Sequence, residues 1–476
     1  MRKIMVNKYK NIVILVMIAM AMITTVNAQY GSFGLTDAQN VSMGNTYTAN
    51  SFGTTAIGKN PAMMLYPLDS SSVIYLQIPN FAVQTGGNSL SGDDINKYFG
   101  SKDSKYLSKA DKDDILSKFK NDLNYYADLG SKDIAISWKH SDAIGAIGLA
   151  ISDYVGGQMT MPADFIDLAL SGNTLNKQFD FSNFDIQLWW IRMYSLSYAR
   201  KIMDFKPESF IKNLSGGISV KMVNGYGYLG TDKINAHFST GENNIITGEI
   251  HTRMLAAKSK DFGGRYPFDT QTFKSNMGPQ PESAGSGMGF DVGFAADLDY
   301  GLRVGLSITD IGSITWDKGT AEFRTDKNLV IDDIDSLNRV NFLNDTSFSS
   351  GSFTTSLPTA LRFGVTYEVT KGVPSIPGML LLALDYNQGF NKMPSNSTTP
   401  RLSIGAMWKT KPYIPVISTG LTNDMSGAIR WSAGLGFSTR ALDFHISSLD
   451  LLSVFTSGSA NPHASAALNF VWRIAY

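Results

Sequence analysis

The feature that most constrains this chain is an alternation of apolar residues with polar or glycine residues, repeated over most of its length. From Met288 to Tyr300 the even positions are apolar or aromatic, and the odd positions are Gly, Ala or Asp. The pattern resumes after Tyr300-Gly301 and runs through Leu302–Thr309. Successive side chains of a strand point to opposite faces, so each such segment has one apolar and one polar face. The alternation therefore predicts an all-β protein.

Two architectures fit this alternation, a soluble two-sheet sandwich and a transmembrane barrel whose apolar face meets lipid. The alternating segments are 9–13 residues long, which exceeds the ~5–6 residues usual in soluble strands and suits a tilted membrane strand. Glycine-rich polar faces and aromatic residues near strand ends also favour the barrel. The last segment, Ala466–Tyr476, ends on an aromatic residue and resembles the assembly signal of such barrels. We expect a transmembrane antiparallel β-barrel, and a soluble secreted β-protein is the alternative.

The segment count predicts about 14 strands. Their expected starting points lie near Ser72, Lys132, Ala143, Ile186, Leu214, Ile246, Gly287, Leu302, Ala360, Met379, Arg401, Ala428, Ala441 and Ala466. A barrel of this size encloses more space than an eight-stranded one. Its interior is therefore expected to be a pore, a plugged pore or a ligand cavity.

The first 28 residues are expected to be a signal peptide. Four basic residues precede the uncharged apolar stretch Ile12–Ile23, and Val26-Asn27-Ala28 offers small residues for cleavage. A membrane-anchoring helix is disfavoured because it needs ~20 apolar residues. Removing the four basic residues leaves 37 Lys and Arg against 41 Asp and Glu, a net charge of −4. These features indicate export to the outer membrane of a Gram-negative bacterium.

Composition excludes several classes of function. The chain has no Cys, which excludes disulfides and thiolate chemistry. The charge balance argues against a nucleic-acid partner. The five His form no metal-binding motif, so we expect no metal and no cofactor. His445 with Ser447 is the one candidate nucleophilic pair, on a shared strand face, and a polar interior residue explains His445 better; we expect no enzyme.

Three pieces do not follow the strand pattern. Residues 29–68 are rich in small polar residues and are expected to pack inside the barrel as a plug. Residues 104–129 are predicted to be a helical insertion, with Ser108 and Asp111 at its start and Gly130 at its end. A shorter helix is predicted at Ala163–Leu170, after Pro162. The barrel itself is assigned to residues 69–476.

The N-terminal segment resembles the hatch of FadL-type outer-membrane transport proteins. The resemblance rests on Gly44 and Tyr47, followed by a small-residue stretch and the motif Asn60-Pro61-Ala62. The layout is also similar to a FadL-related family of unknown function that is common in Bacteroidota-type secreted proteomes. The resemblance implies a 14-stranded barrel plugged by its N-terminus that passes hydrophobic molecules, with outer-membrane lipid around it. Relatives of the PorV type imply the alternative, a secretion-accessory protein whose outer loops or helical insertion bind protein partners.

Charged residues on the polar strand faces are candidate interior residues that either tune the lumen or hold the plug by ion pairs. They are Asp291, Asp297, Arg303, Arg362, Arg430, Asp443, His445 and Arg473. An acidic cluster at Asp326, Asp332, Asp333 and Asp335 lacks the spacing of a calcium loop and is expected in a solvated loop. The motif Gly225-x-Gly227-x-x-Gly230 follows a strand pattern and opens no helix, so we interpret it as strand and loop glycines.

Overall fold

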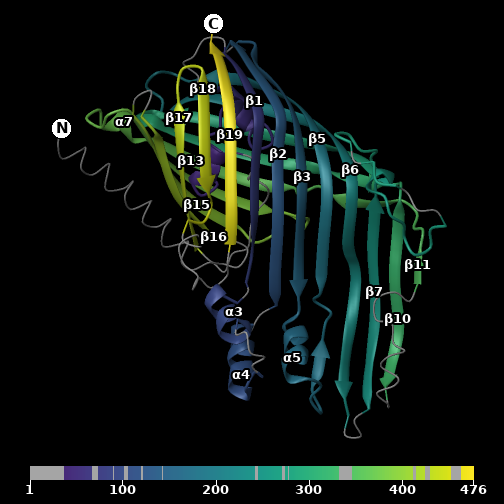
Figure 1. Cartoon of the computed structure of the whole chain (residues 1–476). Coiled ribbons are helices and arrows are strands. Elements are labelled where there is room, and N and C mark those ends of the chain that lie inside the picture. The colour runs from purple at the N-terminus through teal and green to yellow at the C-terminus, as the bar shows by residue number, and fades with distance from the viewer. Residues whose placement is uncertain are drawn as a thin grey trace.

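The chain forms a closed antiparallel β-barrel (Figure 1). The computed structural model describes residues 37–66, 73–88, 90–100, 106–119, 122–141, 143–241, 245–270, 274–276, 278–331, 346–410, 414–423, 429–451 and 463–475. The expected signal peptide, residues 29–36, three of the clustered acids (Asp332, Asp333 and Asp335) and Tyr476 lie outside the described residues.

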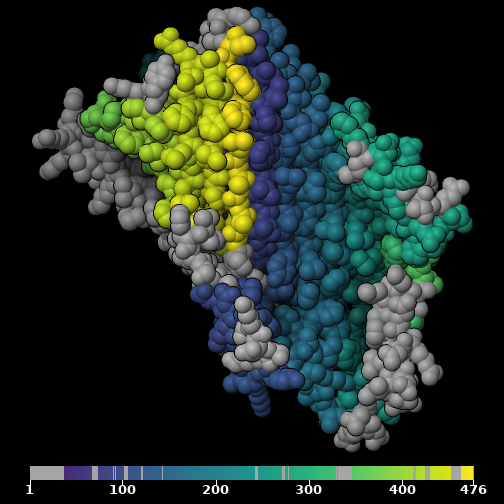
Figure 2. Space-filling model, in the orientation of Figure 1, coloured from purple at the N-terminus to yellow at the C-terminus, as the bar shows by residue number. Residues whose placement is uncertain are grey.

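Among the described residues, fourteen strands pair in a complete ring. β1 closes it, pairing with β2 on one side and with β19 on the other, and Figure 2 shows this contact between the two ends of the chain. The ring strands are β1 (Val73–Gly87), β2 (Leu123–Ser141), β3 (Gly145–Met161), β5 (Asp185–Asp204), β6 (Ile211–Thr240), β8 (Gly285–Leu298), β9 (Leu302–Trp316), β13 (Ala360–Glu368), β14 (Met379–Gly389), β15 (Arg401–Lys409), β16 (Val416–Asn423), β17 (Ile429–Ser438), β18 (Leu442–Ser448) and β19 (His463–Ala475).

The outer face of the ring is apolar and the inner face is polar. Leu435 and Ile446 are 55% and 53% exposed, whereas Arg430 and His445, of the opposite parity in the same strands, are 2% and 3% exposed. A soluble protein buries its apolar faces instead. The arrangement is that of an outer-membrane barrel, whose apolar band faces lipid. The expected fold class is therefore confirmed.

Beyond the ring, one edge of β6 pairs with two different strands along its length. Its first half, Ile211–Gly225, pairs with β8, and its second half pairs with β7 (Ile246–Lys258). β7 pairs in turn with β10 (Thr320–Ile331). The shorter strands β4 (Gln178–Asp180), β11 (Thr346–Phe348) and β12 (Phe353–Ser356) join the same sheet. The long strands of this extension run past the ring at the lower right of Figure 1.

The predicted number of strands is correct, but only because one strand was wrongly included in the ring and another was missed. The segment near Ile246 is β7, which lies in the extension and not in the ring. The ring instead contains β16 (Val416–Asn423), which was not predicted. β2 begins at Leu123, nine residues before the expected start at Lys132. The glycine motif at Gly225 lies within β6, as interpreted from the sequence.

The long helix predicted at 104–129 is wrong in its extent. Two short helices occupy this region, α3 (Gly92–Phe99) and α4 (Lys109–Lys118), and β2 follows from Leu123. The expected cap is present, since the Ser108 hydroxyl accepts from the Asp111 amide at 3.1 Å. Leu123 and Tyr126 fit a helical spacing but pair with β3 along a 19-residue strand; strand pairing overrides the local pattern. Gly130, the predicted helix end, lies in mid-strand.

The remaining helices are short. α5 (Ala163–Ser171) follows Pro162 as predicted. α2 (Ala38–Ser42), η1 (Gly53–Ala56) and η2 (Pro61–Leu65) belong to the N-terminal segment. The others, in connections between strands, are η3 (Lys260–Phe262), η4 (Asp299–Gly301) and α7 (Val369–Gly372). In the part of the chain that the structure describes, no helix is long and apolar enough to cross a membrane.

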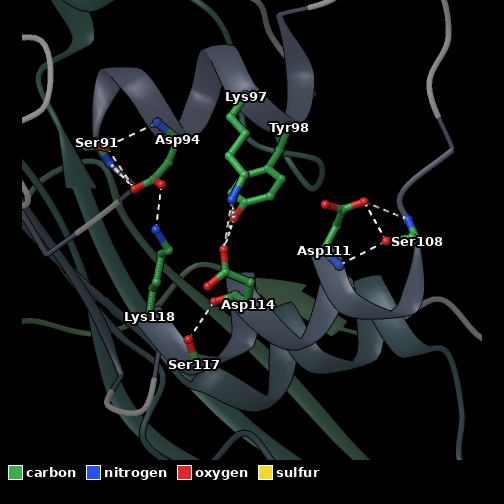
Figure 3. Close-up of polar contacts among 9 residues, drawn as sticks. All are labelled: Ser91, Asp94, Lys97, Tyr98, Ser108, Asp111, Asp114, Ser117 and Lys118. Carbon is green, nitrogen blue, oxygen red and sulfur yellow. Dashed lines mark hydrogen bonds and ion pairs between the residues drawn. The ribbon is translucent and has the colours of Figure 1, made fainter.

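Helices α3 and α4 are held together by charged contacts (Figure 3). The Lys118 ammonium lies 2.5 Å from the Asp94 carboxylate, and Lys97 donates to Asp114 at 3.1 Å. Tyr98 also donates to Asp114. The hydrogen bond from Lys118 lowers the pKa of Asp94, and those from Tyr98 and Lys97 lower the pKa of Asp114. The helix pair is therefore stabilised by ionised carboxylates.

These lowered pKa values predict that acid loosens the helix pair. A carboxyl whose pKa is depressed in the folded state stabilises above its unfolded pKa of about 4, and this contribution is lost as the pH falls through the folded value. We expect amide exchange in α3 and α4, corrected for the intrinsic rate, to be faster at pH 3 than at pH 6. Asp94→Asn in α3 should accelerate it at pH 6, whereas Asp113→Asn in α4 should not. Equal exchange at the two pH values would contradict the role of these contacts.

Candidate functional site

The N-terminal segment, Asp37–Tyr66, lies against the inner face of the barrel. All its residues are buried except Phe52 and Gly58, which are half-buried. α2 contacts β17, β18 and β19, while η2 contacts β5, β6 and β8, on another part of the ring. The segment therefore spans the interior between distant parts of the wall.

Tyr47 of this segment binds three side chains of the wall. Its phenol oxygen accepts hydrogen bonds from Arg362 at 2.7 Å, Asn387 at 2.5 Å and Arg401 at 3.2 Å. Both guanidinium groups also lie within 6 Å of the Tyr47 ring centre, a distance at which cations attract aromatic rings. Tyr47 thus joins three strands of the wall, β13, β14 and β15.

Next to Tyr47, one wall carboxylate binds the backbone of the segment. Asp385 accepts from the amides of Tyr47 and Thr48, each at 2.9 Å, and from the Thr48 hydroxyl at 2.7 Å. Buried amides need such partners, because an unpaired one costs free energy. Sequence reasoning missed Asp385, Asn387 and Arg401. Their alternation with Leu384, Tyr386 and Leu402 was the signal that would have placed them on the inner face.

Asn60 joins two parts of the segment to the wall. Its side-chain amide donates to the carbonyl oxygens of Thr48 at 2.9 Å and Phe294 at 3.0 Å, and its side-chain oxygen accepts from the Ala62 amide at 3.2 Å. Pro61 occupies the first position of η2, where its missing N–H costs nothing. The motif therefore fastens a short helix to β8.

Glycines of the inner wall make room for the segment backbone. A Cβ on Gly217 would lie 2.5 Å from the Ala62 nitrogen, and one on Gly305 would lie 2.4 Å from the Thr48 oxygen. Gly44, in the segment itself, has a φ of +71° and would place a Cβ 2.9 Å from the Leu421 oxygen. The glycine-rich strand faces seen in the sequence are thus the surfaces on which the segment packs.

Most of the predicted interior charges pair with other residues of the wall. Asp291 lies 2.7 Å from Lys221, and Asp297 lies 2.6 Å from Arg303. The remaining pairs are Arg430 with Asp450, at 2.9 Å, and Asp443 with Arg473. Two of the eight predicted residues contact the N-terminal segment. Arg362 donates a hydrogen bond to Tyr47, and the Arg303 guanidinium lies 3.7 Å from the centre of the Tyr66 ring. The segment is held mainly by polar side chains and backbone, and less by ion pairs.

A second piece of chain also enters the barrel, from the connection between β14 and β15. Ser395 and Asn396 of this inner loop (residues 390–400) are each 1% exposed. Asn396 donates to the Thr359 oxygen at 3.1 Å, and Asn391 donates to the Leu357 oxygen at 2.7 Å. Ser395 binds the Asp128 carboxylate on the opposite wall. The interior is therefore occupied by two segments that lie far apart in the sequence.

Two cavities lie along the strands β2, β3 and β5, and Tyr125, Gln158 and Met159 line both of them. The polar pocket, of about 390 Å³, lies between the inner loop and the wall. The apolar groove, of about 880 Å³, includes the exposed side chains of Tyr125, Val155 and Leu188. One side of the groove is formed by the chain after β7, where Phe262 stacks on Trp190 with ring centres 5.5 Å apart. The polar pocket is lined by Asp122, Asn124, Tyr125, Gln158, Met159, Thr160, Asn183, Asp185, Lys392, Asn396 and Ser397.

The other sequence candidates do not assemble into a reactive site. His445 and Ser447 are both buried on the inner face of β18, and within the described residues the Ser447 hydroxyl has no hydrogen-bond partner. Asp326 binds His251 at 2.5 Å, on β7 of the extension. Over the described ranges, no group of three or more His, Asp or Glu side chains is arranged to hold a metal ion.

Comparisons with known proteins give one family and a set of structures. The model of a protein family whose description gives its function as unknown matches residues 67–446. Among curated protein sequences none matches this chain. Similar solved structures are the Ralstonia pickettii toluene transporter TbuX, with 11% identity and a TM-score of 0.43, the Pseudomonas putida toluene transporter TodX, with 10% and 0.43, and a Pseudomonas aeruginosa FadL homologue, with 9% and 0.45. Each similarity covers 94% of this chain and 99% of the other.

The close packing at Gly217 predicts a strong effect of a single methyl group. We expect Gly217→Ala to displace η2 and to lower stability by about 1–3 kcal/mol, as overpacking does. Protease cleavage within Asp37–Tyr66 and the melting temperature measure the two effects. Gly216→Ala is the matched control, since its close contact would be with the end of the flexible Ile202 side chain and not with backbone. Identical protease resistance of the two variants would show that η2 does not depend on this contact.

Proposed function

This chain belongs to DUF5723, a family of unknown function, and we propose that it is an outer-membrane barrel that binds or passes small hydrophobic molecules. In this proposal residues 1–28 direct export and are cleaved, and residues 29–68 form a plug that moves to open the interior. The barrel surface contacts the lipid of the outer membrane of a Gram-negative bacterium.

The observation that carries the proposal is the way in which the interior is filled. The N-terminal segment is attached to the wall by hydrogen bonds such as those of Tyr47 and Asn60, and it forms no strand of the ring. Each such bond contributes a net stabilisation of only about 1 kcal/mol. Because the segment contributes no strand, the ring would stay closed if these bonds were broken together, which is what a movable plug requires.

The apolar groove supports a hydrophobic class of molecule. Its volume of about 880 Å³ falls within the range of small-molecule sites. Leu188 and Val155 in it are 40% and 41% exposed on the lipid-facing side of the wall. An apolar solute dissolved in the surrounding lipid could reach such a groove without being exposed to water.

The lengths of the connections between strands support an orientation of the barrel in the membrane. Those after β2, β8 and β17 are only three residues long, whereas those after β1 and β3 carry α3, α4 and α5. Outer-membrane barrels have short periplasmic turns and long outer loops. We place the helices on the cell exterior and the C-terminus at the periplasmic end.

Deletion of residues 29–66 tests the plug. We expect the deletion variant to show larger and longer conductance events in planar bilayers, and faster entry of an apolar dye into proteoliposomes, than the full chain. The reason is that the deletion removes a segment that occupies the interior. Conductance and dye entry equal to those of the full chain, in a variant that still folds as a barrel, would overturn the transport proposal.

Tyr47→Phe is a milder test that leaves the segment in place. It removes the oxygen that three wall side chains bind, at an expected cost of about 1–3 kcal/mol because these partners are buried. We expect more frequent opening events in bilayers and a lower melting temperature. Tyr198→Phe serves as control, because its hydroxyl donates to Ile144 on the outer side of the wall. Equal opening rates for both variants would show that Tyr47 does not hold the segment.

A second candidate function is a non-transporting accessory role of the PorV type. It is favoured by the exposed apolar side chains of α3, where Ile95 and Phe99 are 48% and 57% exposed. Such residues mark protein contacts when they gather in a patch. Isolation of a stable large complex that is lost in an Ile95→Ser, Phe99→Ser double variant, together with no solute flux, would favour this function over transport.

A further inference from the structure

The polar pocket lies beside the inner loop, and its lining is unlike that of a hydrophobic path. We propose that it binds a small, neutral, polyhydroxylated molecule of saccharide type. This inference goes beyond the proposed function, because it assigns a second class of ligand to a separate cavity beside the inner loop. The volume of about 390 Å³ is at the small end of the range for ligand sites and suits one or two sugar rings.

Side chains on the wall of the pocket are held in place by their neighbours. The Thr160 hydroxyl donates to Asn124 at 2.8 Å, and the Asn183 amide donates to Asp122 at 3.2 Å. Asp122 also accepts from the backbone amide of Ala163, at the start of α5. The pocket therefore presents oriented donors and acceptors before any ligand arrives, which lowers the entropy cost of binding.

Gln158 supplies an unused acceptor. Its side-chain nitrogen donates to the Lys392 carbonyl on the inner loop. Its side-chain oxygen is buried and has no hydrogen-bond partner within the described residues. A buried acceptor without a donor is destabilising, because it has lost its hydrogen bond to water. A ligand hydroxyl that donated to this oxygen would remove that cost.

The charges around the pocket select against anions. Asp122 and Asp185 contribute two carboxylates, and Lys392 contributes one ammonium group. The balance is negative, so a fatty acid or a phosphate would be repelled. Hydroxyl groups both donate and accept, so neighbouring hydroxyls of one molecule can satisfy the carboxylates, the ammonium group and the Gln158 oxygen together.

A ligand in the pocket would contact the inner loop as well as the wall. Lys392, Asn396 and Ser397 line the pocket from the loop, and the other lining residues come from β2, β3, β5 and the chain that precedes these strands. A ligand in the pocket would therefore bridge the loop and the wall. We expect occupancy to stabilise the loop against exchange and proteolysis.

Titration calorimetry on the full chain in amine-oxide detergent tests the site. Maltose represents a free saccharide, octyl glucoside represents the sugar head of a glycolipid, and octanoate is the anionic comparison. We expect saturable binding of at least one sugar and none of octanoate. Asp185→Asn and Lys392→Met should each weaken sugar binding at least tenfold. Lys371→Met in α7 should leave it unchanged, and unaltered heat-modified migration on gels shows that each variant is folded.

The outcomes separate the sources of the ligand and decide the proposal. Tighter binding of maltose identifies a free saccharide, and tighter binding of octyl glucoside identifies a membrane glycolipid. Absence of saturable binding of both sugars, or binding unaffected by both pocket variants, overturns the inference. Because apolar dye entry is measured separately, failure here leaves the test of the transport proposal independent.

Discussion

The packing of the barrel interior depends on one constraint. The polar groups of the inner wall and of the N-terminal segment must form hydrogen bonds with each other, because they are buried away from water. The wall turns polar side chains inward, and the N-terminal segment brings a backbone without a strand partner. The two meet directly: Asp385 receives two amides, while Lys132 donates to the carbonyl oxygens of Thr54 and Ile57 at 2.9 and 3.2 Å. Ser432 donates to the Ser42 oxygen at 2.9 Å. Since buried backbone groups must be paired, the wall side chains do for this segment what a neighbouring strand does elsewhere.

This constraint explains the use of charge. Taking a lone charge out of water is costly, and removing its partner leaves that cost uncompensated. Several wall charges are accordingly paired within the wall, as Lys221 lies between Asp291 and Asp310 at 2.7 and 2.5 Å. A segment held by many such pairs would leave orphan charges on the wall whenever it moved. The wall charges that do bind the segment, such as Asp385 and Lys132, bind its hydroxyl and backbone groups and not an opposite charge.

The sequence predicted the fold better than the site, for a physical reason. Alternation reports which face a residue belongs to, and it placed Arg362 and Asp291 on polar faces. It contains no information on which strand lies opposite, so the contact of Tyr47 with β13, β14 and β15 had no local signal. The helix predicted at 104–129 is wrong for the same reason. Leu123 and Tyr126 fit the spacing of a helix as well as that of a strand, and only pairing with β1 and β3 decides between the two. The inner loop has no periodicity, and its burial follows from Ser395 and Asn396 finding partners across the barrel.

A bulge sets which face of the wall each residue of β2 occupies. In β2 the register with β3 shifts between Lys132 and Ile134. Before the shift the outward residues have odd numbers, such as Tyr125 and Leu129, and after it they have even numbers, such as Ile136. A strand without the bulge would turn one of these sets inward, since a slip of one residue exchanges the faces. The bulge therefore keeps the apolar residues of β2 outside along the whole strand, from Tyr125 before it to Trp138 after it.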